Sequence, residues 1–112
     1  MGATSSKYSS NDYELAIKIS KELEYLLESE FKAQGKGLHE KISSVQSQLP
    51  VKLIKRMRYC ATIRNNLIHQ RGFDRIPDRA GFISSFEESA EELRVILEQS
   101  HSSQAGKACT IM

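Results

Sequence analysis

Residues 59–69 read Tyr59-Cys60-Ala61-Thr62-Ile63-Arg64-Asn65-Asn66-Leu67-Ile68-His69 and combine an apolar helical repeat with one arginine, two asparagines and a histidine. At about 100° per residue, the apolar positions here and just upstream share a sector of about 120°. They are Leu53, Met57, Cys60, Ala61, Leu67 and Ile68. Arg64 lies near the centre of this sector, where a guanidinium must be paired or solvated because its burial is otherwise costly. The stretch therefore indicates either the polar lock of a small helical bundle or a site that handles nucleic acid.

The rest of the chain predicts three further helices, so we expect an all-α fold. The four helices are expected at residues 11–33, 38–46, 50–68 and 78–99. Asn11 and Asp78 are suitable N-caps, and Glu14 would complete a capping box with Asn11. The apolar stripes beside the third helix are Leu15, Ile19, Leu23 and Leu26 in the first helix and Phe82, Phe86, Ala90, Leu93 and Leu97 in the fourth. We expect a compact up-down bundle of three long helices and one short helix over residues 11–99, between a flexible segment over 1–10 and a flexible tail over 100–112.

Charge is distributed unevenly, although the 112-residue chain carries only +2. Residues 50–79 contain eight basic and two acidic side chains, a net of +6, whereas residues 80–99 contain one basic and five acidic side chains, a net of −4. A basic segment concentrates anions such as nucleic acid. Alternatively, the two segments are neighbouring helices that neutralise each other. A separate acidic protein partner is also compatible with this pattern.

Two cysteines, Cys60 and Cys109, do not form a disulfide framework, so a reducing, cytoplasmic compartment is expected. No apolar run reaches the roughly 18 residues of a membrane span, and no signal peptide is visible. The cysteines and the three histidines show no metal-ligand spacing. The sequence therefore predicts neither a metal nor a cofactor.

Both ends of the chain carry patterns typical of lipidation. The start matches M-G-x-x-x-[ST], which would place a myristoyl group on Gly2. The last four residues, Cys109-Thr110-Ile111-Met112, fit C-a-a-X and would direct a farnesyl group to Cys109. Two lipids together would hold the protein at the cytoplasmic face of a membrane, where one binds only marginally. The alternative is that both matches are accidental.

Arg64 has three interpretations. It could form a structural salt bridge with a carboxylate such as Glu22 or Glu92, reach the surface through its aliphatic stem, or line a cleft, formed either by one chain or together with a second copy. His69 lies five residues on, about 140° around a regular helix. The two side chains can meet only if the helix loosens after Leu67 or if a second chain completes the site.

The run Arg64-Asn65-Asn66-Leu67-Ile68-His69 resembles the R-x4–6-H motif of the HEPN superfamily (higher eukaryotes and prokaryotes nucleotide-binding), at its shortest spacing. A polar residue directly after the arginine is typical of that family, and so is a motif late in the third long segment of a helical bundle. The resemblance covers residues 11–99, and its specific content is the motif and the order of helices.

This resemblance implies a homodimer that cuts or binds RNA without metal, with the motifs of the two chains facing each other across a cleft. Arg64 would hold the scissile phosphate, and His69 would transfer a proton near neutral pH. Asn65 would orient either the phosphate or His69. Basic residues expected to follow the RNA backbone are Lys55, Arg58 and Arg71, with Tyr59 and Phe73 as candidates for base stacking. The alternative function is a non-catalytic interaction module tethered to a membrane through its lipidated ends.

Overall fold

Four α-helices and one short 3-10 turn follow one another along the described part of the chain. A computed structural model describes the backbone of residues 8–111 and the side chains of residues 8–99. The elements are α2 (Asp12–Phe31), α3 (Leu38–Val45), η1 (Gln46–Gln48), α4 (Val51–His69) and α5 (Arg79–Ile111). No strand occurs among the described residues. The predicted all-α bundle of three long helices and one short helix is confirmed.

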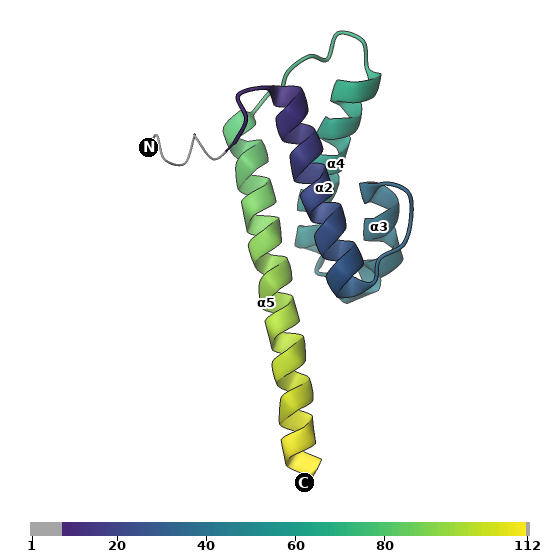
Figure 1. The fold of residues 1–112 in the computed structure, drawn as a ribbon, viewed down its shortest axis with the longest axis vertical. Coiled ribbons are helices and arrows are strands. Elements are labelled where there is room, and N and C mark those ends of the chain that lie inside the picture. Colours follow the sequence, from purple (N-terminus) through teal and green to yellow (C-terminus); the bar gives the residue numbers. More distant parts are fainter. Residues whose placement is uncertain (1–7, 112) are drawn as a thin grey trace.

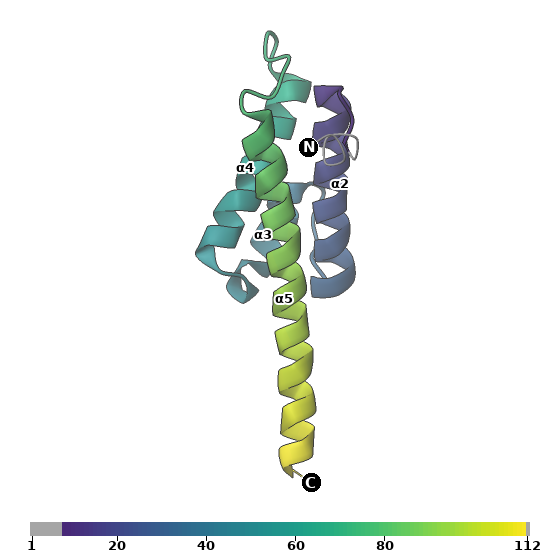
Figure 2. The same cartoon turned by 90° about the vertical axis from the view of Figure 1, so that its left-hand side faces the viewer.

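The long helices form a bundle in which α2 and α5 run in the same direction and α4 runs in the opposite direction (Figures 1 and 2). α4 packs against both neighbours, and α3 packs on α2 and α4 on the side away from α5. Each helix contributes side chains to one core, because each has an apolar stripe at helical spacing. Fully buried examples are Leu23, Ile42, Leu53, Met57, Phe82 and Leu93.

The start of α2 is fixed by its predicted cap and by a serine that was not predicted. The backbone N–H of Glu14 donates to Oδ1 of Asn11 at 3.1 Å. Oγ of Ser9 accepts from the backbone N–H of Asn11 at 3.0 Å and donates to Oε1 of Glu14 at 2.5 Å, so Ser9 bridges the two residues of the expected capping box. Tyr8 also reaches α5, where its hydroxyl donates to Glu87 at 2.6 Å. Residues 8–10, predicted as part of a flexible segment, are therefore attached to the bundle.

The end of α2 comes at Phe31, slightly before the predicted boundary. Lys32 takes a left-handed conformation with φ of 62°, and the backbone N–H of Ala33 donates to the carbonyl of Leu27 at 3.0 Å. A left-handed residue is a common capping motif at a helix end, and glycine usually occupies it. Ala33 is buried, so the motif turns the chain back onto the core.

Helix α5 begins at its predicted cap but continues past its predicted end. The backbone N–H of Gly81 donates to Oδ1 of Asp78 at 3.0 Å. The sequence predicts a helix end near Gln99 and a flexible tail, whereas α5 runs to Ile111 and extends well beyond the ends of α2 and α4 (Figures 1 and 2). Residues 100–111 contain no proline and a single glycine, so nothing in the local sequence forces the helix to stop there.

Predictions about the two ends remain predictions. Gly2 and the side chain of Cys109 lie outside the described residues. In the described part of the chain, none of the helices combines the length and the apolar character needed to cross a bilayer.

Charge pairing between α4 and α5 follows the predicted contrast between the basic and acidic segments. Arg56 donates to Oε1 of Glu92 at 2.8 Å and lies 3.6 Å from Glu88. Arg79, at the start of α5, pairs with Asp12 at the start of α2. For Arg56, Glu88 and Glu92 the interpretation of mutually neutralising helices is confirmed.

Candidate functional site

The apolar seam of α4 rotates along the helix, and this rotation brings Arg64 out of the core. The predicted core positions Leu53, Met57, Cys60, Ala61 and Leu67 are buried. Ile68 was also predicted to be buried but is 42% exposed, whereas Ile63 is buried at 7%. The buried sector therefore shifts towards Ile63 and Leu67 in the last turns. Arg64, on the trailing edge of this shift, is only half-buried.

Arg64 lines a polar cavity of about 460 Å³, which we call the Arg64 cavity. Its walls come from the middle of α2, the segment that leads into α3, and the second half of α4. The lining residues are Ile17, Ser20, Lys21, Glu24, Lys36, Gly37, Leu38, His39, Glu40, Ala61, Arg64 and Asn65. Within a single chain Arg64 therefore lines a cleft, as the third interpretation proposed, and its partial exposure also agrees with the second.

The guanidinium of Arg64 has one hydrogen-bond partner among the described residues. Its Nη1 donates to Oδ1 of Asn65 at 2.9 Å, and no described carboxylate lies within ion-pair distance. The two carboxylates proposed as partners are elsewhere: Glu92 is bonded to Arg56, and Glu22 lines a different cavity. The predicted salt bridge with either residue is therefore wrong. Most of the five N–H donors of the guanidinium are free to bind a ligand.

Two acidic residues share the cavity wall with Arg64, but each already has a partner. Oε1 of Glu40 accepts from the backbone N–H of Lys36 at 3.0 Å. Oε1 of Glu24 lies 3.8 Å from Nζ of Lys41. The wall also contains three basic side chains, those of Lys21, Lys36 and Arg64. Three positive groups against two negative ones leave the wall with a net positive charge.

Two further donors of the wall lack acceptors. The hydroxyl of Ser20 is buried and has no hydrogen-bond partner within residues 8–99. The eight-residue helix α3 begins beside the cavity, and its N-cap, Gly37, has no side chain to cap the first turn. The first intrahelical bond runs from Lys41 N–H to the carbonyl of Gly37, so the preceding N–H groups have no acceptor in the helix. A helix N-terminus with a free guanidinium opposite is suited to an anion.

His69 does not join this site within one chain. α4 remains a regular α-helix through His69, so the five-residue step leaves the two side chains about 140° apart. His69 is exposed and is not part of the cavity wall. Asn65, by contrast, lies in the wall and touches Arg64. Of the three predicted catalytic residues, the structure brings Arg64 and Asn65 together and leaves His69 apart.

None of the three predicted RNA-binding residues lines the Arg64 cavity. Lys55 lies nine residues before Arg64, which is about 180° around α4, and is exposed on the other side. Arg58 ties α4 to α3: its guanidinium donates to Nδ1 of His39 at 3.1 Å and to Oγ of Ser43 at 2.9 Å. Arg71 is exposed beyond the end of α4.

His39 is part-buried beside Arg58, and this environment favours its neutral form. Partial burial, and secondly the charge of Arg58, lower the pKa of His39. A neutral imidazole can accept the Arg58 bond on Nδ1 and leave its Nε2–H as a donor. His39 is thus a neutral residue of the cavity wall.

The two aromatic residues proposed for base stacking, Tyr59 and Phe73, pack against the core, and Cys60 is buried in it. The ring of Tyr59 packs edge-to-face on Phe82 with a centroid distance of 6.2 Å, and Phe73 packs against the core cluster. Burial raises the pKa of Cys60 to about 12, so its thiol is unreactive at neutral pH.

Sequence reasoning missed Ser20, Lys21 and Lys36 as members of the site. Ser20 carried one signal, since it is a polar residue on the predicted buried side of the first helix. Lys21 and Lys36 carried none, because only the tertiary fold brings them to Arg64.

No family model, curated protein or solved structure matches this chain.

Proposed function

We propose that this chain is a helical RNA-binding module that receives a backbone phosphate in the Arg64 cavity. The observation that carries the proposal is the guanidinium of Arg64, which lines a polar cavity with only Asn65 as a partner. A half-buried arginine without a carboxylate is costly in isolation, and an anionic ligand would compensate its charge.

Phosphate is the anion that fits these donors best. Guanidinium binds phosphate through two parallel hydrogen bonds, and helix N-termini bind phosphate through backbone N–H groups. The wall supplies both, together with Lys21 and Lys36. The R-x4-H motif at Arg64 and His69 favours RNA over a small free anion, as the HEPN resemblance implies.

Binding, rather than cleavage, is the function that one chain can support. The regular helix through His69 separates the candidate acid-base group from Arg64. Cleavage without metal would require His69 from a second chain to approach the phosphate. Endonuclease activity of such a dimer is the finer form of the proposal and needs its own test.

Fluorescence anisotropy with a labelled single-stranded RNA tests the binding proposal. Arg64→Gln should weaken binding about 10- to 100-fold, since a hydrogen bond to a charged group contributes about 1.5–3 kcal/mol. It should also reduce the slope of log K against log salt by about 0.7, the value for one lost contact on a single strand. Lys55→Gln is the matched control, because Lys55 lies on the opposite side of α4. Equal effects of the two substitutions, or no binding by the parent protein, would overturn the proposal.

Cleavage is tested separately by incubating RNA with purified protein in EDTA. If both Arg64→Ala and His69→Ala abolish cleavage, a metal-independent ribonuclease is established. If intact RNA is recovered from the parent protein in an assay that shows binding, the chain is a binding module alone.

The motifs at Gly2 and Cys109 support a second candidate, a protein-interaction module held at the cytoplasmic face of a membrane. Mass spectrometry of the protein purified from eukaryotic cells tests this candidate. Added masses of a myristoyl and a farnesyl group on these residues would support it. Unmodified residues would exclude it.

A further inference from the structure

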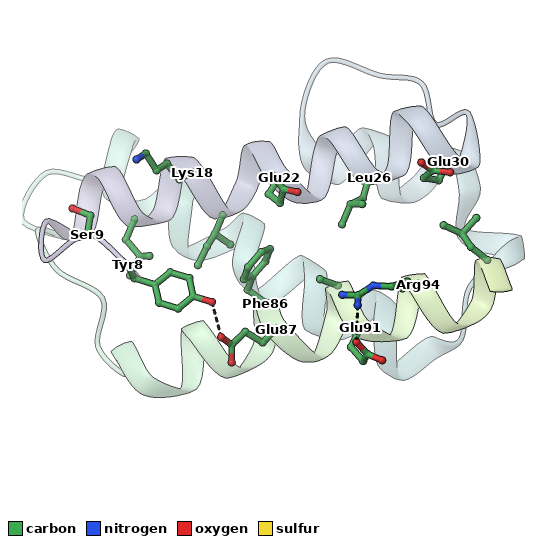
Figure 3. A pocket seen from close by; sticks show the side chains of 14 residues that line it. Tyr8, Ser9, Lys18, Glu22, Leu26, Glu30, Phe86, Glu87, Glu91 and Arg94 are labelled. Atoms are coloured by element: carbon green, nitrogen blue, oxygen red, sulfur yellow. Dashed lines mark hydrogen bonds and ion pairs between the residues drawn. The ribbon is translucent and has the colours of Figure 1, made fainter. Parts of the chain in front are cut away.

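A long groove runs between α2 and α5, on the side of α2 that faces away from the Arg64 cavity (Figure 3). It has a volume of about 860 Å³. Its apolar lining residues are Leu15, Ile19, Leu26, Phe86, Ala90 and Leu97. Leu15 and Ile19 are buried in the core and form the floor of the groove, whereas Leu26, Phe86, Ala90 and Leu97 are only partly buried and leave apolar surface in it. Helices of a second chain could cover this surface.

Charged residues border the groove in an order that reverses between its two ends. On α2, Lys18 lies near one end and Glu30 near the other. On α5, Glu87 lies towards the Lys18 end and Arg94 towards the Glu30 end. Glu22 and Glu91 also line the groove between these positions, and Glu91 is paired with Arg94 of its own helix. Towards its two ends each helix therefore has one basic and one acidic position, which a copy of the same helix in the opposite direction would match.

One symmetry axis matches both helices at once. The midpoint between Lys18 and Glu30 is position 24, and the midpoint between Glu87 and Arg94 falls between positions 90 and 91. Because α2 and α5 run in the same direction and the ion pair between Asp12 and Arg79 aligns their starts, position 24 lies at the level of position 91. A two-fold axis across the groove at this level would place Lys18 opposite Glu30, and Glu87 opposite Arg94, of a second chain.

We propose that the groove is the dimer interface of this protein, closed by the same groove of a second copy in antiparallel orientation. The partly buried apolar residues of the two chains would form the centre of the contact, bordered by four ion pairs between the chains. The present partners of two of these groups are exposed neighbours on their own helices, Glu14 for Lys18 at 3.8 Å and Glu91 for Arg94 at 3.3 Å. Exposed pairs of this kind contribute little and can be exchanged.

This dimer is independent of the proposed RNA-binding function. At about 100° per residue, the α2 residues of the groove, such as Lys18, Glu22 and Leu26, lie opposite those of the Arg64 cavity, such as Ser20 and Lys21. The groove dimer would leave both Arg64 cavities on its outer faces. It also differs from the arrangement that the HEPN resemblance implies, in which the two motifs face each other.

Charge exchange in solution tests the proposal. Sedimentation equilibrium of the full chain should give twice the monomer mass of 12.7 kDa. Lys18→Glu and Glu30→Lys should each raise the dimer dissociation constant at least about tenfold, because each places like charges opposite one another. The double variant restores the pairs with reversed sign and should return the constant to within about threefold of the parent. Lys21→Glu makes the same charge change on the opposite side of α2 and should have no effect.

Cysteine cross-linking near the axis gives a second measurement. Ala90→Cys, in a chain with Cys109→Ser, should form a disulfide-linked dimer on mild oxidation, whereas Thr62→Cys on the exposed side of α4 should not. A monomer at several hundred micromolar would overturn the proposal, and so would a dimer that neither charge reversal weakens or that the double variant fails to restore. RNA binding by the Lys18→Glu chain separates the two proposals, since loss of the dimer leaves the Arg64 cavity intact.

Discussion

The ammonium group of Lys41 donates a 2.7 Å hydrogen bond to the carbonyl oxygen of Gly35, although its side chain is only 5% exposed. The same group lies 3.0 Å from Oε2 of Glu28 and 3.8 Å from Oε1 of Glu24. Lys41 thereby joins the loop before α3 to the last turns of α2, and this loop forms part of the Arg64 cavity. Buried lysines are rare unless they are paired, and Lys41 satisfies this condition.

Lys41→Met should therefore destabilise the protein by about 1–3 kcal/mol, because the carbonyl of Gly35 loses a charged donor while the side-chain volume stays similar. The free energy of unfolding in urea measures this change. Lys52→Met, at an exposed position of α4, is the control and should change stability by less than about 0.5 kcal/mol. Equal values for the two variants would show that the Lys41 contacts add no stability.

Lys32→Gly should stabilise the protein by about 0.5–1 kcal/mol. Lys32 holds φ of 62° at the end of α2, a conformation that costs little for glycine and more for a residue with a side chain. Lys32 is exposed, so little packing is lost. Lys21→Gly, in the middle of the same helix, should instead destabilise by about 1 kcal/mol. Thermal unfolding of both variants shows whether each substitution raises or lowers stability. A loss of stability on Lys32→Gly would contradict this account of the helix end.

Helical periodicity was sufficient to predict the elements and most of the core. Leu15, Ile19 and Leu23 of α2 and Leu93 of α5 are buried as their spacing predicts. Periodicity could not predict that Ile63 is buried and Ile68 exposed. A periodic pattern gives the direction of an apolar face but not where along the helix each neighbour packs. The end of α5 was missed for a different reason, since a serine-rich segment without proline permits either a helix or a coil.

The candidate site was predictable only at its centre. Arg64 stood out because it interrupts an apolar sector, and that signal is local. Its surroundings depend on tertiary contacts between segments that are far apart in sequence, so Lys36 and the unpartnered hydroxyl of Ser20 could not be assigned. The buried Lys41 gave no signal either, because its partners, Gly35 and Glu28, lie in the preceding loop and helix.

Leu93→Ala should destabilise the bundle by about 2–5 kcal/mol. Leu93 is 0% exposed in the stripe of α5 that faces the core, so its truncation leaves a cavity in addition to the lost burial. Leu67→Ala, at 4% exposure in the last turns of α4, should fall in the same range. Val95→Ala is the control, since Val95 is 37% exposed on the same helix as Leu93 and should cost less than about 1 kcal/mol. Urea denaturation measures all three. A cost below about 0.5 kcal/mol at both leucines would contradict the packing described for α4 and α5.

Acid should weaken the protein through His39. Burial, and then the charge of Arg58, lower the pKa of His39 below its ordinary value of 6.5. The unfolded chain therefore binds a proton at a higher pH than the folded chain does. The stabilisation is fully present above about pH 6.5 and is lost as the pH falls through the lower pKa of the folded state.

The free energy of unfolding, measured between pH 7.5 and 5, should fall more in the parent protein than in His39→Gln, which cannot take up the proton. His69→Gln removes an exposed histidine instead and should retain the loss of stability in acid. The comparison is restricted to this range because carboxylates begin to titrate below it. Parallel curves for the parent and His39→Gln would mean that the 3.1 Å contact with Arg58 does not hold a neutral imidazole in the cavity wall.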